Sequence, residues 1–229
     1  MISKKVAILQ SNYIPWKGYF DMINMVDEFI IYDDCQYTKN DWRNRNRIKT
    51  RNGSQWITIP VNYSYPQKIR DTKISYRAWN QKHWKTIKQN YSKAPFWREH
   101  HDFIEDLYWE CNEDYLSEVN YRFIKSICEL LGLDTRISWS MDYNLKEGKT
   151  ERLVDLCVQA GADEYISGPA AKCYIDENLF IKENIRVTYM DYSGYPQYDQ
   201  LYLPFEHNVS IIDLILNMGP KSREYLKSF

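Results

Sequence analysis

The chain has 229 residues, enough for one domain or at most two, and its 30 Lys+Arg balance 31 Asp+Glu. The net charge of −1 argues against a global field that would attract nucleic acid or an anionic membrane surface. Eight glycines and eight prolines are too few for a low-complexity chain. Aromatic residues reach 16%, with 20 Tyr and 8 Trp, which suits cores and ligand-stacking pockets alike.

We find no targeting or membrane segment in the sequence. The apolar run 6–9 is too short for a signal peptide, and no window approaches 18 apolar residues. The five cysteines are odd in number and widely spaced, unlike a disulfide framework. We therefore expect a cytoplasmic protein that does not insert into a membrane.

The first elements in chain order predict a βαβ unit. Apolar runs at 6–9 and 29–32 are typical of buried parallel strands, and the apolar residues of 19–27 recur at helical spacing. Asn52-Gly53 then predicts a type I′ hairpin turn within an antiparallel insertion at about 40–62.

A helical middle segment and renewed alternation follow. Three helices are expected over about 79–132. The later elements are strands at 135–140, 164–166 and 185–190, and helices that begin near Thr150 (a cap), Ile175 and Ser210 (a capping box with Asp213). These elements predict a single α/β domain over 1–229, with a Rossmann-like parallel sheet. An α+β fold with separate helical and sheet regions is the alternative.

Ligands of an open parallel sheet bind outside the carboxyl ends of its strands, and the loops there are polar and aromatic. Their convergence favours a small-molecule pocket over turn chemistry and aromatic packing. The candidate binding residues are Gln10, Asn12, Tyr13, Trp16, Gly18, Tyr19, Asp33, Gln36, Ser167, Gly168, Lys172 and Tyr198. In the first loop, Trp16 is suited to stacking on a base or sugar ring; packing on neighbouring helices is the alternative.

A basic stripe lies in the predicted hairpin, where Arg43, Arg45, Arg47, Lys49 and Arg51 alternate. On a strand they share one face. They can grip a diphosphate or follow a nucleic-acid backbone, or they form a solvated face. We expect at least Arg45 and Arg47 to face the pocket and contact phosphate, and Arg51 to be solvated.

Gly148-Lys149-Thr150 is similar to the end of a Walker A loop. That loop needs a glycine five positions before Gly148, where Tyr143 stands, so a P-loop is excluded. A helix N-terminus with Lys149 and Thr150 can still hold an anion.

Motifs for metal binding and for common nucleophiles are absent from the sequence. It has no C-x-x-C, H-E-x-x-H, G-x-S-x-G or G-x-G-x-x-G, and its four histidines show no ligand spacing, so we expect no metal site. His83 and His207 can act as general bases because histidine titrates near neutral pH; a structural role is the alternative.

Several motifs together point to a family. The first is AILQSNYIPWKGYF at 7–20, with Ser11 where the family more often has proline. The others lie at 33–37, 44–48, 148–152, 165–172, 196–200 and 210–214. With them the chain resembles the WbqC-like proteins of bacterial surface-polysaccharide (O-antigen) gene clusters. The motif at 196–200 adds Gln200 to the binding candidates.

The resemblance implies a protein that handles unusual amino sugars. We expect an enzyme that adds an acyl or aminoacyl group to the amine of a dTDP- or UDP-linked sugar. The candidate bases are His83, Asp34 and His207, in that order, and the oxyanion donors are backbone amides around Gln10 and Ser167-Gly168. No coenzyme motif identifies the acyl donor. A non-catalytic nucleotide-sugar binding protein and a nucleic-acid-binding module are the alternatives.

A weaker resemblance concerns the fold. The order of elements is similar to the nucleotidylyltransferase-like Rossmann group, which includes pantothenate synthetase and relatives that join carboxylates to amines through adenylates. Their H-x-G-H signature is missing, since 15–19 reads PWKGY. This departure argues against adenylate chemistry.

Overall fold

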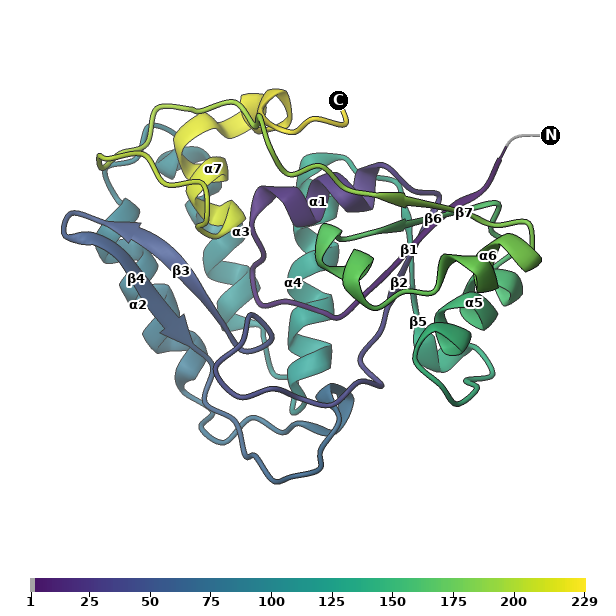
Figure 1. Cartoon of the computed structure of the whole chain (residues 1–229). Coiled ribbons are helices and arrows are strands. Elements are labelled where there is room, and N and C mark those ends of the chain that lie inside the picture. The colour runs from purple at the N-terminus through teal and green to yellow at the C-terminus, as the bar shows by residue number, and fades with distance from the viewer. Residues whose placement is uncertain (1–2) are drawn as a thin grey trace.

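The computed structural model describes residues 3–229 and shows a mixed α/β fold (Figure 1). Within these residues, a parallel sheet contains five strands in the order β5-β2-β1-β6-β7. The strands are β1 (Lys5–Leu9), β2 (Glu28–Ile31), β5 (Arg136–Trp139), β6 (Glu164–Ser167) and β7 (Arg186–Tyr189). β1 and β2 pair in parallel, with Val6 opposite Glu28. This pairing confirms the Rossmann-like α/β prediction over the α+β alternative.

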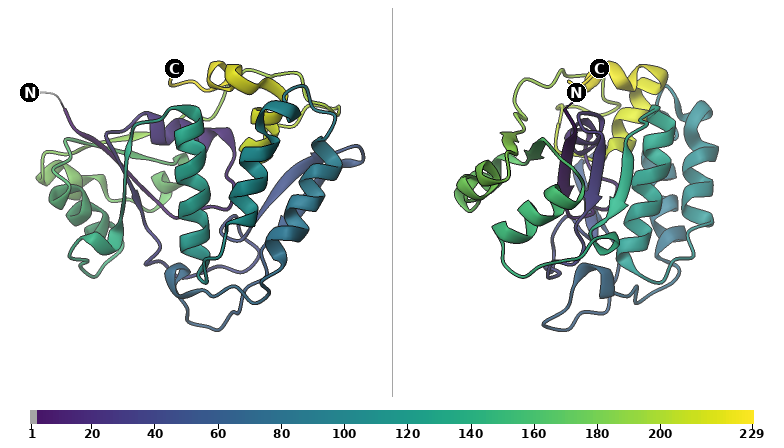
Figure 2. Two further views of the ribbon diagram at one scale, coloured as in Figure 1. Left: turned by 180° about the vertical axis from the view of Figure 1, so that it is seen from behind. Right: turned by 90° about the vertical axis from the view of Figure 1, so that its right-hand side faces the viewer.

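Helices cover both faces of the sheet, which explains why its central strands are continuous apolar runs. Ala7 packs toward one face, whereas Val6 and Ile8 pack toward the other, because successive residues of a strand point to opposite sides. The first face is covered by α1 (Lys17–Asn24), α4 (Leu116–Leu131) and α7 (Ile211–Met218), and the second by α5 (Thr150–Gln159) and α6 (Glu177–Lys182) (Figure 2).

The order of the strands reverses at β1. From β1 the chain moves outward through β2 to β5, and then returns to place β6 and β7 on the other side of β1. Ligands of doubly wound sheets bind in the crevice where the order reverses, outside the carboxyl ends of the strands. Here that crevice lies between the loops after Leu9 of β1 and Ser167 of β6.

The segment between β2 and β5 forms the predicted hairpin insertion and helical middle. Its elements are β3 (Arg45–Thr50), β4 (Gly53–Thr58), α2 (Trp79–Tyr91), α3 (Trp97–Trp109) and α4. The hairpin packs on these helices through a buried core that includes Ile48, Ile57, Trp84 and Ile87. The hairpin and these helices therefore form a separate packed layer beside the parallel sheet.

The hairpin turn differs from the predicted type I′ turn at Asn52-Gly53. Thr50 pairs with Gly53, so Arg51 and Asn52 are the turn residues. Of these four residues only Gly53 has a positive φ, 102°, whereas a type I′ turn needs positive φ at both central positions. Gly53 thus follows the turn as a left-handed glycine at the start of β4.

Two helix starts test the predicted caps. Ser210 is the N-cap of α7, and its Oγ accepts a hydrogen bond from the Ile212 N–H at 3.2 Å. The predicted capping box is incomplete, because the Asp213 carboxylate accepts from tyrosine hydroxyls instead. Thr150 is the first residue of α5, not its cap; its Oγ accepts from the Asp176 N–H.

Short 3-10 helices connect or follow the larger elements. They are η1 (Ile69–Asp71), η2 (Ser140–Asp142), η3 (Pro169–Cys173) and the longer η4 (Gly219–Tyr225). Across residues 3–229, none of the helices combines the length and the apolar character that spanning a bilayer requires.

Candidate functional site

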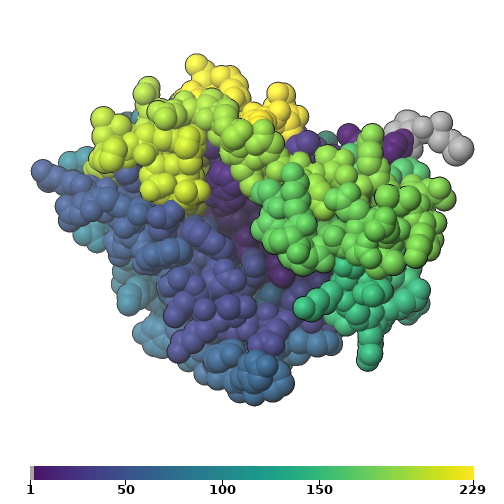
Figure 3. Space-filling model, in the orientation of Figure 1, coloured from purple at the N-terminus to yellow at the C-terminus, as the bar shows by residue number. Residues whose placement is uncertain are grey.

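A hollow opens on the face shown in Figure 3. It is bordered by the hairpin insertion, by the chain before α7 and by the segment around η3, and the N-terminal chain lies at its floor. The N-terminal chain lines part of two cavities, one of about 610 Å³ and one of about 230 Å³. We call them the strand-end cavity and the tryptophan cavity.

The strand-end cavity occupies the crevice where the strand order reverses. Its walls include the ends of β1, β2 and β6 and the N-terminus of α5. The predicted residues that line it are Gln10, Asp34, Gln36, Lys149, Ser167 and Gly168. They come together because parallel strands end at the same edge of a sheet.

Two cations stand at the α5 end of this cavity. Lys149 is the N-cap residue of α5, and Arg152 lies in its first turn. Arg152 donates to the Tyr32 hydroxyl at 3.2 Å and to the Lys146 carbonyl at 2.6 Å. Unpaired N–H groups and the helix dipole favour an anion at a helix N-terminus, and both cations add to that preference. Arg152 was not predicted, although it ends the motif at 148–152.

Asp34 is the candidate base that lines the strand-end cavity. It is 4% exposed, and its carboxylate is already engaged. The Arg70 Nη1 lies 2.6 Å from Oδ1, the Lys68 Nζ lies 3.3 Å from the same oxygen, and the Ser140 hydroxyl donates to Oδ2 at 2.8 Å. Proton transfer to Asp34 would require one of these partners to give way.

His83, the first-ranked base, is a residue of α2 that faces β4, and it does not line the strand-end cavity. Its Nε2 is 3.1 Å from the Thr58 carbonyl, which can only accept, so Nε2 carries the proton. Its Nδ1 therefore accepts from the Tyr13 hydroxyl at 2.8 Å. Burial lowers the pKa of His83 to about 4. These contacts describe a neutral, structural histidine.

His207 lies on the chain before α7. Its ring meets the Phe205 ring edge-on, with 4.6 Å between the centroids. Partial burial lowers the pKa of His207, and the nearby Lys17 lowers it further. Asn208, the next residue, lines the tryptophan cavity.

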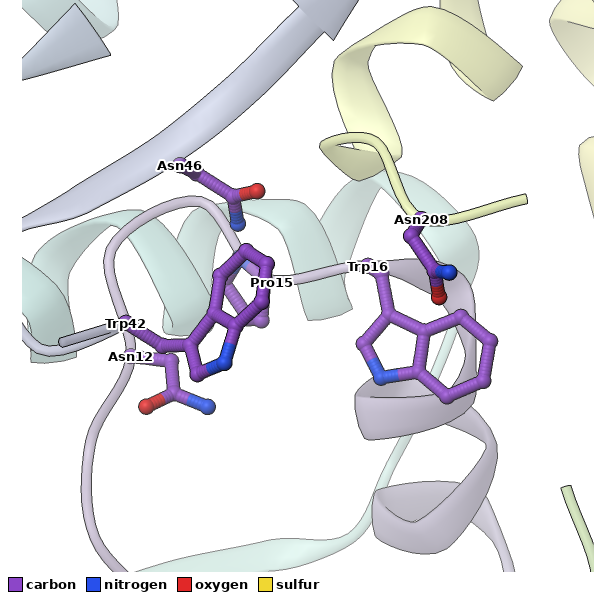
Figure 4. A pocket seen from close by; sticks show the side chains of 6 residues that line it. All are labelled: Asn12, Pro15, Trp16, Trp42, Asn46 and Asn208. Atoms are coloured by element: carbon purple, nitrogen blue, oxygen red, sulfur yellow. The ribbon is translucent and has the colours of Figure 1, made fainter. Parts of the chain in front are cut away.

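The tryptophan cavity receives two of the predicted residues of the first loop, Asn12 and Trp16 (Figure 4). The Trp16 ring packs edge-on against Tyr192 and Tyr195, with centroids 5.2 and 5.5 Å apart. Gly18 lies directly beneath this ring, since a Cβ on Gly18 would come 2.3 Å from the Trp16 Cζ2 atom. The glycine thus allows the indole to reach its position.

Other predicted residues lie in the protein interior. Asp33 is fully buried and accepts from the Ser11 N–H at 2.8 Å, from the Ser11 hydroxyl at 2.7 Å and from the Ser117 hydroxyl. Tyr198 and Gln200 donate to the buried Asp213 at 2.8 and 2.9 Å. Their polar groups are therefore occupied by partners within the fold.

Three further candidates also stand apart from the cavity linings. Tyr13 bonds to His83, and Tyr19 packs in the core while its hydroxyl donates to the Gln10 carbonyl at 3.1 Å. The Lys172 Nζ lies 5.1 Å from the centroid of the Tyr189 ring.

The hairpin arginines contact tryptophan rings. The Arg45 guanidinium carbon lies 4.2 Å from the centroid of Trp56, and that of Arg47 lies 5.6 Å from Trp56 and 6.0 Å from Trp42. Trp42 and Trp56 are 38% and 41% exposed, so this Arg–Trp face borders solvent. Arg51 at the turn is exposed, as predicted.

Arg43 is the residue of the stripe that bonds to a lining residue of each cavity. Its Nη2 donates to the Gln10 Oε1 at 3.2 Å, and its Nη1 donates to the Asn12 Oδ1. Gln10 lines the strand-end cavity and Asn12 lines the tryptophan cavity. Arg43 was not among the predicted site residues; its place in the alternating stripe was the available signal.

Fold and site together define a doubly wound α/β protein with a cavity at the reversal of its strand order. The chain belongs to the WbqC-like protein family, whose sequence profile matches residues 10–225. It is 54% identical over 226 residues to the "Uncharacterized protein Rv1507c" of Mycobacterium tuberculosis (strain ATCC 25618 / H37Rv), and the match covers 98% of both chains. No solved structure matches the chain.

Proposed function

We propose that the protein binds a nucleotide-linked amino sugar in the strand-end cavity and transfers an acyl or aminoacyl group to the sugar amine, within surface-polysaccharide (O-antigen) biosynthesis. The observation that carries the binding proposal is the pair Lys149 and Arg152 at the N-terminus of α5, beside the crevice where the strand order reverses. The amino-sugar part rests on the family to which the chain belongs.

The lining of the strand-end cavity suits the nucleotide half of such a ligand. Lys149, Arg152 and the free N–H groups of α5 supply charge and donors for a diphosphate. Tyr32 and Tyr174 supply aromatic surface for a nucleoside, and the Gln36 amide supplies both a donor and an acceptor for its polar edge.

The transfer itself requires an activated acyl donor, such as a thioester or an acyl phosphate. The sugar ammonium first loses a proton to become the nucleophilic amine. Its nitrogen then bonds to the acyl carbon, the bond to the donor's thiolate or phosphate breaks, and the nitrogen loses a second proton, which the leaving thiolate or phosphate accepts. Asp34 faces the cavity and is the group proposed to hold the sugar ammonium and to receive the first of these two protons. His83 is not retained in this role because of its position and its two hydrogen bonds.

A non-catalytic nucleotide-sugar binding protein is the second candidate. The observation that favours it is the engagement of Asp34 by Arg70, Lys68 and Ser140, which occupies both carboxylate oxygens. In this case the cavity would bind the same ligand without turnover.

Calorimetric titration with UDP- and dTDP-linked amino sugars tests the binding proposal. Replacing both Lys149 and Arg152 by Ala should weaken binding by about 1.5–3 kcal/mol for each charged hydrogen bond lost. Lys85→Ala is the matched control, because Lys85 is an exposed cation on α2. An unchanged affinity in the double variant would overturn the proposed site.

Mass spectrometry separates the two candidates. A sugar nucleotide that gains the mass of the acyl group in the presence of a thioester or acyl phosphate donor supports transfer. Tight binding without a mass shift across the donors supports the binding protein. Preference for single-stranded oligonucleotides over every sugar nucleotide would instead support a nucleic-acid-binding module.

A further inference from the structure

We infer that the tryptophan cavity binds the pyranose ring of the sugar, and that Arg43 binds the phosphate that links this ring to the nucleotide. The inference rests on the proposed function and gives the sugar and the nucleotide separate places. It assigns a role to Trp42, which no sequence motif singled out, and it selects Arg43 from the basic stripe as the phosphate-binding residue.

The cavity is lined by two tryptophans, three asparagines and one proline, and none of the described lining residues carries a formal charge. They are Asn12, Pro15, Trp16, Trp42, Asn46 and Asn208. Figure 4 shows the indoles of Trp16 and Trp42 on opposite sides, with amides near each. A pyranose has apolar C–H faces, which suit the electron-rich face of an indole, and a rim of hydroxyls, which suit amide donors and acceptors.

The size of the cavity favours a single ring. Its volume of about 230 Å³ lies below the range of about 300–1,000 Å³ that is usual for drug-sized ligands. The strand-end cavity, at about 610 Å³, lies within that range and carries the cations that a nucleoside diphosphate requires. The two cavities therefore differ in both volume and charge, as the two halves of a nucleotide-linked sugar do.

Arg43 lies between a lining residue of the strand-end cavity and one of the tryptophan cavity. One guanidinium nitrogen donates to Gln10 and the other to Asn12, so the group is held in place by two neutral amides. Its ion pair with Asp41 is long, 3.7 Å, and the Asp41 side chain is 31% exposed. The remaining N–H groups keep an arginine's capacity for paired hydrogen bonds to phosphate oxygens.

The tryptophan walls are supported by further aromatic contacts. Trp16 is held by Tyr192 and Tyr195, and Trp42 packs against Trp56 with 5.1 Å between the ring centroids. Walls that are already ordered lose little conformational entropy when a ring enters between them, which favours binding.

The test compares ligands with and without the sugar. Calorimetry would measure UDP, dTDP and a panel of their amino-sugar conjugates on the wild type, Trp42→Ala and the control Trp109→Ala, which removes a 47%-exposed tryptophan on α3. Trp42→Ala should lower the affinity for the sugar conjugates roughly tenfold, the scale of a lost aromatic contact plus its buried area. The affinity for UDP and dTDP should stay within about twofold of the wild type. Trp109→Ala should change neither.

Two results would overturn the inference. If Trp42→Ala lost affinity equally for the conjugates and for UDP and dTDP, the cavity would hold the nucleobase and not the sugar. If it lost affinity for neither, Trp42 would not belong to the site. Circular dichroism would check folding, and Trp42→Phe would keep part of the stacking if the alanine variant unfolds.

Saturation-transfer NMR with methyl glycosides of the same amino sugars separates this inference from the proposed function. Glycoside signals that depend on Trp42, in a protein that binds no nucleotide, would reject the proposed function and keep the sugar cavity. Nucleotide-sugar binding that depends on Lys149 and Arg152 but not on Trp42 would support the proposed function and reject the sugar cavity.

Discussion

The Arg43 Nη2 lies 3.2 Å from the Oε1 of Gln10, so an arginine of the insertion contacts the residue that directly follows β1. This contact brings the hairpin to the edge of the sheet where the strand order reverses. The insertion thus places a guanidinium beside a lining residue of the strand-end cavity.

Replacing Arg43 by Ala should weaken nucleotide-sugar binding by about 1.5–3 kcal/mol, the range for a hydrogen bond to a charged group. The melting temperature should change little, because the released Gln10 and Asn12 amides border cavities and can bond to water. Arg43→Lys should recover only part of the affinity, since an ammonium lacks the planar fork. Calorimetry and thermal unfolding measure both quantities. A large drop in melting temperature with unchanged affinity would make Arg43 a structural residue.

Gly18→Ala should displace the Trp16 indole, because the new Cβ would come within 2.3 Å of that ring. We expect weaker binding of the sugar conjugates and a change in tryptophan fluorescence. Alanine is also the better helix former by about 0.5–1 kcal/mol, which offsets packing lost against Tyr192 and Tyr195. The same substitution in a Trp16→Phe background serves as the control. Unchanged sugar affinity in Gly18→Ala would place Trp16 outside the site.

His83 should make the fold sensitive to acid. Its pKa is lowered to about 4 by burial, against about 6.5 in an unfolded chain, so between these values the unfolded state binds the extra proton. The contribution of His83 is therefore complete above pH 6.5 and falls by about 3 kcal/mol as the pH decreases to 4. His83→Gln keeps an amide donor and acceptor but does not titrate, so its unfolding free energy should fall less over this range. Urea unfolding at several pH values measures the difference, and parallel curves for both proteins would contradict it.

Asp33→Ala should lower the free energy of unfolding by about 3 kcal/mol, because it leaves the Ser11 N–H and two buried hydroxyls without their acceptor. Asp102→Ala, at an 82%-exposed side chain, is the control and should stay within about 0.5 kcal/mol of the wild type. Urea denaturation provides both values. If Asp33→Ala were as stable as the wild type but no longer bound the nucleotide-linked sugar, Asp33 would be a ligand-binding residue and not a structural one.

The sequence by itself determined the parallel sheet, the inserted hairpin and the edge of the sheet where a cavity forms. Apolar runs and helical spacing are local properties, and parallel strands bring their carboxyl ends to one edge whatever lies between them. Gln10, Gln36 and Ser167 therefore meet as expected, although the loops that carry them are far apart in the chain.

Tertiary structure decided which polar side chains face the cavities and which satisfy one another inside the fold. His83 bonds to Tyr13, 70 positions away, and Asp33 bonds to Ser117, 84 positions away. A buried polar group needs a partner, and partners this distant are set by how helices and strands pack, not by local pattern. The same packing places Arg43 between Gln10 and Asn12, which no spacing along the chain indicates.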